Sequence, residues 1–83
     1  MLQNQPNPFN DNTNITFYLP ESGVVDMSIT DMNGRIIQSQ SQYYEKGTNS
    51  VLLDASALGG SGIYYYTITT ASDKKTMRMI LLH

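Results

Sequence analysis

The sequence has 83 residues, no cysteine and a formal net charge of −2, and 14% of its residues are charged. This length allows one small domain, and the lack of cysteine excludes disulfides and thiolate metal sites. The few Lys and Arg residues are scattered, which argues against nucleic-acid binding, and the longest apolar run, 79–82, is far shorter than the roughly 20 residues of a membrane-spanning helix.

A polar segment with two prolines opens the sequence. Pro6 and Pro8 fix φ at about −65° and remove two backbone donors, so this segment is neither helix nor central strand. We interpret residues 1–12 as a stiff linker that brings Phe9 to the end of a single domain over residues 13–83. No basic stretch followed by an apolar one is found here, so any export signal peptide is expected on a part of the protein that precedes this sequence.

Alternation of apolar and polar residues predicts β-strands throughout the domain and no long helix. The expected strands are residues 13–19, 24–31, 35–42, 49–53, 63–70 and 75–82, and residues 9–12 would add a short seventh. The Ser- and Gln-rich half of 35–42 indicates an exposed or edge strand. The side chains expected to face the core are Ile15, Phe17, Leu19, Val25, Met27, Ile29, Tyr64, Tyr66, Ile68, Met77, Met79 and Leu81.

Glycine and asparagine mark the turns between these strands. Asn33-Gly34 is the strongest hairpin signal, because both residues tolerate a positive φ. Residues 54–58 are predicted to form a single helical turn, capped by Asp54 and stopped by Gly59-Gly60, and Gly62 opens the next strand. Short strands at a spacing of about ten residues predict an all-β antiparallel sandwich.

No catalytic, cofactor or metal site is predicted. The one histidine, His83, is the last residue, and no serine lies in a G-x-S-x-G turn, so nucleophilic catalysis is not expected. Most carboxylates flank glycine or asparagine in predicted turns, where aspartate satisfies local backbone donors. Asp11 could meet Asp31 or Asp54 at one end of the sandwich, but we do not expect a metal there.

Tyrosine side chains support an alternative function. A surface carbohydrate-binding or adhesion module would present rings to a sugar, and the rings that could face solvent are Tyr18, Tyr43, Tyr44 and Tyr65. A third interpretation is a structural spacer that stabilises a neighbouring catalytic domain.

Several motifs occur in an order that is specific when they are taken together. They are the Pro-Asn-Pro-Phe segment within residues 3–10, Asp31-Met32-Asn33-Gly34-Arg35, Asp54-Ala55-Ser56-Ala57-Leu58, Gly62-Ile63-Tyr64-Tyr65-Tyr66 and the last strand from Lys75 to His83. In this order, the whole chain resembles the type A C-terminal sorting domain of type IX secretion cargo proteins, the Por secretion family. The resemblance implies a seven-stranded immunoglobulin-like β-sandwich that directs a cargo protein across the outer membrane.

The resemblance also implies partners and a location. Members cross the inner membrane by means of a separate signal peptide and are then recognised by the outer-membrane translocon and its shuttle protein. The cargo reaches the cell surface or the medium, and a sortase commonly removes the sorting domain. No nucleic acid, cofactor or membrane span is expected.

Recognition by the translocon would fall on the linker, the turn glycines, the start of the tyrosine-rich strand and the last strand. The residues concerned are Pro6, Pro8, Phe9, Gly34, Gly62, Tyr64, Lys75, Arg78, Met79 and Leu81. The same residues have a purely structural explanation, since turn glycines and alternating apolar residues need no partner. The chain departs from the family at His83, where a lysine is frequent, although the last strand stays basic.

Overall fold

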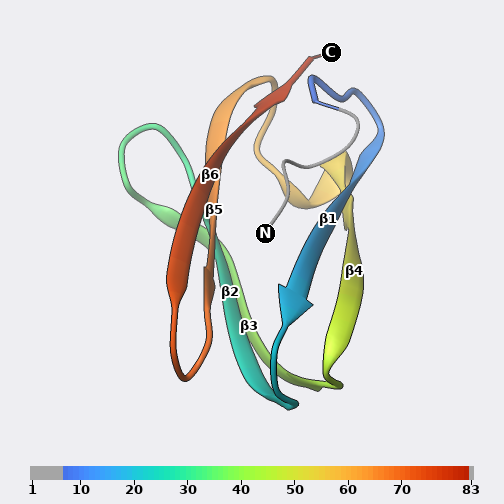
Figure 1. Ribbon diagram of the computed structural model, residues 1–83. Coiled ribbons are helices and arrows are strands. Elements are labelled where there is room, and N and C mark those ends of the chain that lie inside the picture. The colour runs from blue at the N-terminus through green and yellow to red at the C-terminus, as the bar shows by residue number, and fades with distance from the viewer. Residues whose placement is uncertain (1–6, 83) are drawn as a thin grey trace.

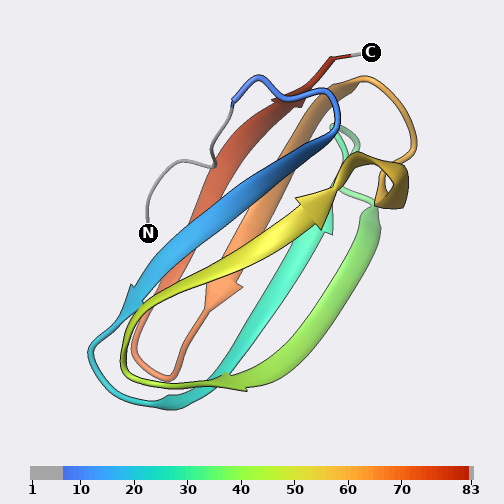
Figure 2. The ribbon, with the colours of Figure 1, turned by 90° about the vertical axis from the view of Figure 1, so that its right-hand side faces the viewer.

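The computed structural model describes residues 7–82, which fold into two antiparallel β-sheets packed face to face (Figure 1 and Figure 2). The all-β antiparallel sandwich predicted from the sequence is therefore confirmed. Within these residues, six strands and one short 3₁₀ turn make up the regular structure. They are β1 (Asn12–Leu19), β2 (Gly23–Thr30), β3 (Ile36–Tyr44), β4 (Gly47–Asp54), η1 (Ala55–Ala57), β5 (Gly62–Thr69) and β6 (Lys74–Leu81).

The strand order is that of an immunoglobulin-like sandwich. β1 pairs with β4 in a two-stranded sheet, and the four-stranded sheet has the order β3-β2-β5-β6. These two groups correspond to the B–E pair and the C′-C-F-G order of immunoglobulin domains. β3 and β6 form the two edges of the larger sheet, as expected for the Ser- and Gln-rich strand.

Alternation along the strands builds the core between the two sheets. Every predicted core residue except Met77 is buried. Met77 is half-buried, because β6 has a neighbouring strand on one side only. Phe9, Leu53 and Leu58 join this core from the linker, from β4 and from the turn after η1.

Two strands are longer than their local sequence predicts. β3 continues to Tyr44, and β4 starts at Gly47 rather than at Asn49. β4 pairs with β1 over its whole length, starting with Gly47 opposite Leu19. Pairing with β1 therefore extends β4 over the polar residues after the turn, because strand formation depends on the neighbouring strand as well as on local propensity.

Residues 7–11 of the linker lie against the domain. Phe9 is 3% exposed and forms an isolated parallel bridge with Leu81 of β6. The expected short strand over 9–12 is reduced to this bridge, because the chain then leaves β6 for the other sheet, where the Asp11 carbonyl accepts the N–H of Ala55 at 2.8 Å. The predictions for Pro6 and for the residues before it lie outside the described residues, and the boundary after residue 12 stays a prediction.

Candidate functional site

Motif segments that are far apart in the sequence meet at one end of the sandwich. Phe9 bridges Leu81, Leu81 pairs with Gly62, and Asn12 at the end of the linker pairs with Asp54. The β2–β5 pairing brings the loop after β2 to the same end, which is the upper end in Figure 1. We call this region the signature end. Its residues are Phe9, Asp31–Arg35, Asp54–Leu58, Gly60–Tyr64 and Leu81.

Three hydrogen bonds fasten the linker to the last strand. The N–H of Phe9 donates to the carbonyl of Ile80 at 3.0 Å, and the N–H of Leu82 donates to the carbonyl of Phe9 at 2.8 Å. The N–H of Ile80 donates to Oδ1 of Asn7 at 2.9 Å. Residues 7–9 of the linker therefore lie beside β6.

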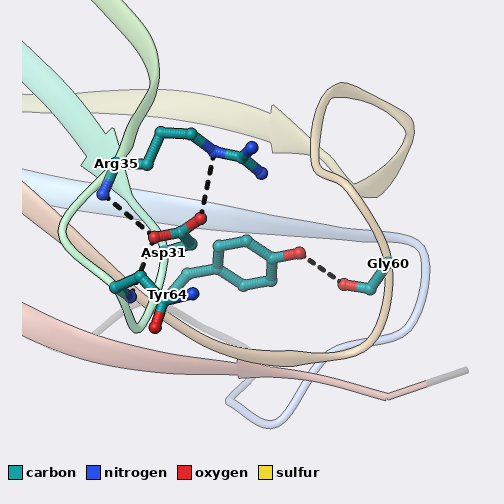
Figure 3. A network of polar contacts seen from close by, with 5 residues as sticks. Asp31, Arg35, Gly60 and Tyr64 are labelled. Carbon is teal, nitrogen blue, oxygen red and sulfur yellow. Dashed lines mark hydrogen bonds and ion pairs between the residues drawn. The ribbon is translucent and has the colours of Figure 1, made fainter.

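Asp31 organises the hairpin loop between β2 and β3 (Figure 3). Its Oδ1 accepts the N–H groups of Asn33 at 2.9 Å and of Arg35 at 3.0 Å, and its Oδ2 lies 3.2 Å from Nε of Arg35. The backbone closes the loop as well, because the N–H of Gly34 donates to the Asp31 carbonyl at 3.1 Å. Gly34 has a φ of +83°, so the loop requires a residue without a Cβ at this position.

This loop differs in one respect from the predicted Asn-Gly turn. The predicted hairpin is present, but Asn33 does not adopt the positive φ that it tolerates, since within the described residues only glycines have one. Three residues, 32–34, lie between Asp31 and Arg35, and β3 starts only at Ile36. A three-residue hairpin loop needs a single left-handed residue after its turn, which explains why Gly34 alone adopts that conformation.

Asp54 caps the single helical turn, as predicted. Its Oδ1 accepts the N–H of Ser56 at 2.9 Å. The N–H of Leu58 donates to the carbonyl of Ala55 at 3.0 Å, and both of these side chains are buried. The turn thus anchors the end of β4 in the core, next to the Asp11 carbonyl that binds Ala55.

Tyr64 joins the start of β5 to the glycine-rich loop before it. Its ring is buried, as predicted, and its hydroxyl donates to the carbonyl of Gly60 at 2.6 Å (Figure 3). Gly60 and Gly62 have φ values of +139° and +146°. A Cβ at either position would meet no atom within 4 Å, so the backbone conformation, not a lack of space, requires glycine.

The hydrogen bonds to Asp31 and Asp54 favour their charged forms. The backbone N–H of Arg35 is the main cause that lowers the pKa of Asp31, and the N–H of Asn33 and the guanidinium of Arg35 act in the same direction. The N–H of Ser56 is the main cause that lowers the pKa of Asp54. Both pKa values fall below the ordinary 3.8, so both turns are held by carboxylates at neutral pH.

Four of the residues predicted for recognition are part of the core. Phe9 and Tyr64 are 3% and 6% exposed, and Met79 and Leu81 are fully buried. A receptor cannot contact these side chains while the domain is folded. These four residues can therefore affect recognition only indirectly, because they stabilise the fold that a receptor would bind.

The other predicted residues do not share one surface. Gly34 and Pro8 are exposed at the signature end or next to it. Lys75 pairs with Ile68 near the opposite end of the sandwich, and Arg78 lies midway along β6. Recognition by these residues stays a prediction.

The exposed tyrosines do not form a common binding platform. Tyr18 is exposed on β1 in one sheet, and Tyr43 is exposed on β3 in the other. Tyr44 packs edge-to-face against Phe17, with ring centroids 5.1 Å apart, and Tyr65 is half-buried. No observation favours the carbohydrate-binding alternative.

The structure offers no further chemistry at this end. Within residues 7–82, no group of three or more His, Cys, Asp or Glu side chains could hold a metal ion. The same part of the chain contains no helix with the length and apolar character needed to cross a membrane.

The sequence predicted the cap at Asp54 but did not single out Asp31 or Asn7, which also hold the signature end together. Asp31 and Asp54 each accept an N–H two residues ahead, and this Asx-turn spacing is a signal that the sequence does contain. Asn7 has no comparable local signal, because its partner Ile80 lies 73 residues away.

Comparison with known proteins identifies the arrangement of these motifs. A family model described as "Secretion system C-terminal sorting domain" matches residues 5–82, which is nearly the whole chain. Neither the comparison with curated proteins nor the comparison with solved structures found a match.

Proposed function

We propose that this chain, which belongs to the family of secretion system C-terminal sorting domains, is recognised as a folded module by the outer-membrane translocon and its shuttle protein. The family is the C-terminal sorting signal of type IX secretion. Such a signal implies contact with the secretion machinery, an N-terminal cargo domain, and export to the cell surface or the extracellular space.

The convergence of the family motifs at the signature end carries this proposal. Each motif supplies a bridge, a cap or a glycine conformation to the fold. A sorting signal needs a stable, transferable surface rather than a reactive group. The arrangement therefore supports recognition of the folded domain by its shape and surface chemistry.

The position of the linker supports a role in cargo handling. Asn7 and Phe9 are bonded to β6, so a receptor that holds the last strand also holds the junction with the cargo. We infer that the domain passes through the periplasm with its cargo attached. A sortase would then cut on the cargo side of residue 7.

A reporter fusion tests the proposed function. The chain is fused to the C-terminus of a periplasm-directed fluorescent reporter in a host that has the secretion system. We expect the reporter at the cell surface or in the medium, and in the periplasm when the translocon gene is deleted. Retention of the reporter in the periplasm of the intact host, with the domain folded, would contradict the proposal.

Deletion of the last strand is a poor substitute for this test. Met79 and Leu81 are fully buried, so loss of 79–83 removes part of the core as well as any contact with a receptor. Substitutions that leave the domain folded are needed to separate the two effects.

A further inference from the structure

Among the described residues, the edge of β6 is open at Thr76, which lies between two covered positions. The linker covers its C-terminal end at Ile80, and Oδ1 of Asp73 accepts the N–H of Lys74 at 2.8 Å at the other end. Because Ile80 turns its N–H and carbonyl outward, alternation turns those of Thr76 outward as well. Within residues 7–82, no strand pairs with this side of Thr76.

An apolar hollow lies between the two sheets near this edge. It has a volume of about 270 Å³, and its lining includes Leu19 and Pro20 from the β1 side and Ile68 and Lys75 from the β5–β6 side. β1 and β6 run along the same flank of the sandwich (Figure 2). A strand added to β6 would therefore cover the half-buried Met77 with its core-facing side and extend towards this hollow.

The edge is basic. Lys74, Lys75 and Arg78 are three of the five Lys and Arg residues of the chain, and all three are exposed. Alternation places Lys74, Thr76 and Arg78 on the outward face of β6. An added strand would set its own outward side chains beside these residues, where opposite charges attract and like charges repel.

The same charges disfavour a second copy of the chain as the added strand. Two β6 edges in contact would bring the cations of one copy beside those of the other, and lysine on an edge strand is a common protection against such pairing. β3, the other edge of the same sheet, carries no charged residue. β6 is thus suited to a partner of different sequence.

We propose that the edge of β6 over Lys74–Arg78 binds an extended acidic segment of a partner protein, with carboxylates on alternate residues and small apolar side chains between them. The segment would exchange backbone hydrogen bonds with Thr76 and cover about five residues, the usual length of a strand. This inference rests on the proposed function, since the partner would be a component of the secretion machinery.

Amide hydrogen exchange of the full 83-residue chain tests the proposal. The probe is a capped peptide of about six residues that alternates glutamate and valine, matched by a peptide with lysine in place of glutamate. We expect the acidic peptide to slow exchange at the Thr76 amide, and the basic peptide to bind at least about tenfold more weakly.

Two variants distinguish edge binding from general charge attraction. Thr76→Pro removes the outward N–H, which proline can lack on an edge strand, and should abolish binding while the fold remains. Lys74→Glu should weaken binding of the acidic peptide by about threefold or more, whereas Lys46→Glu in the β3–β4 turn should leave binding unchanged. Equal effects of Lys74→Glu and Lys46→Glu would overturn the proposal.

Two other results would also overturn it. One is unchanged exchange at Thr76 with saturating acidic peptide. The other is protection of Thr76 that rises with protein concentration when no peptide is present, which would assign the edge to a second copy.

Export of the reporter separates this inference from the proposed function. If the wild-type fusion reaches the surface and Thr76→Pro and Lys74→Glu do not, both are supported. If all three are exported equally, the edge inference fails and the sorting function stands. If the wild-type fusion is retained with its domain folded, the sorting function itself is contradicted.

Discussion

The two ends of the sandwich are held together by different kinds of contact. The backbone of the signature end is fixed by the buried ring of Phe9, which bridges the linker to β6, by two turns capped by aspartate, and by three glycines with a positive φ. The opposite end, formed by the turns at 20–22, 45–46 and 70–73, has one glycine with a positive φ, Gly47, and is held by side-chain bonds such as the one from Ser22 Oγ to Glu45 at 3.1 Å. The residues that identify the family are therefore mainly those that set its fold.

The residues that fix the fold are therefore largely different from the exposed residues that a partner could contact. The signature end leaves few functional side chains on the surface, because most of its large apolar residues are buried, with Met32 as an exposed exception, and its aspartates bind their own loops. Most of the chain's basic side chains lie along β6, with Lys74 and Lys75 near the opposite end. We expect changes at the signature end to alter stability, and changes at the exposed residues of β6 to alter binding.

Replacement of Phe9 should have the largest effect on stability. Phe9→Ala removes a buried ring that joins the linker to β6, and we expect a loss of about 3–5 kcal/mol in the free energy of unfolding. Urea denaturation measures it. Tyr18→Ala, at a ring that is 65% exposed, should change stability by no more than about 0.5 kcal/mol. Equal losses in the two variants would contradict the contrast between core and surface.

Replacement of Gly62 should have an intermediate effect. Gly62→Ala forces a Cβ onto a residue with a φ of +146°, and we expect a loss of about 1–3 kcal/mol. Gly23→Ala is the matched control, because a Cβ at Gly23 has open space and the φ of Gly23 lies outside the positive range. Thermal unfolding of both variants should show a clear decrease for Gly62→Ala alone, and a similar decrease in both would rule out backbone conformation as the cause.

Acid should weaken the signature end by a smaller amount. Because the folded-state pKa of Asp31 is lowered, its contribution is complete above the ordinary value of 3.8 and is lost as the pH falls through the folded-state pKa. Asp31→Asn should therefore lose less stability than the wild type between neutral pH and pH values below 3.8. Thermal unfolding across this range checks it, and equal decreases in the two proteins would contradict the role of this carboxylate.

Much of the sandwich could be predicted because alternation is a local property. Ile15, Ile29 and Tyr66 are each flanked by polar or half-buried neighbours, and their burial follows from a period of two. The start of β4 at Gly47 was not predictable in this way, since it depends on pairing with β1.

The site was predictable in its parts but not in its arrangement. The order of the motifs identifies the family, and Asp31 and Asp54 stand at the spacing of Asx turns. That Phe9 meets Leu81 depends on contacts across the whole length of the chain. No local pattern contains that information, because several pairings of the same strands satisfy the same alternation.

The most direct test of this account is the export of a reporter fused to the Met79→Leu domain. Met79 is fully buried on the strand that we propose binds a partner, and leucine has a similar volume, so the domain should stay folded. The account predicts that the reporter reaches the cell surface in the same fraction as with the wild-type domain, because this residue acts through the fold. A domain with native thermal stability whose reporter stays in the periplasm would contradict it.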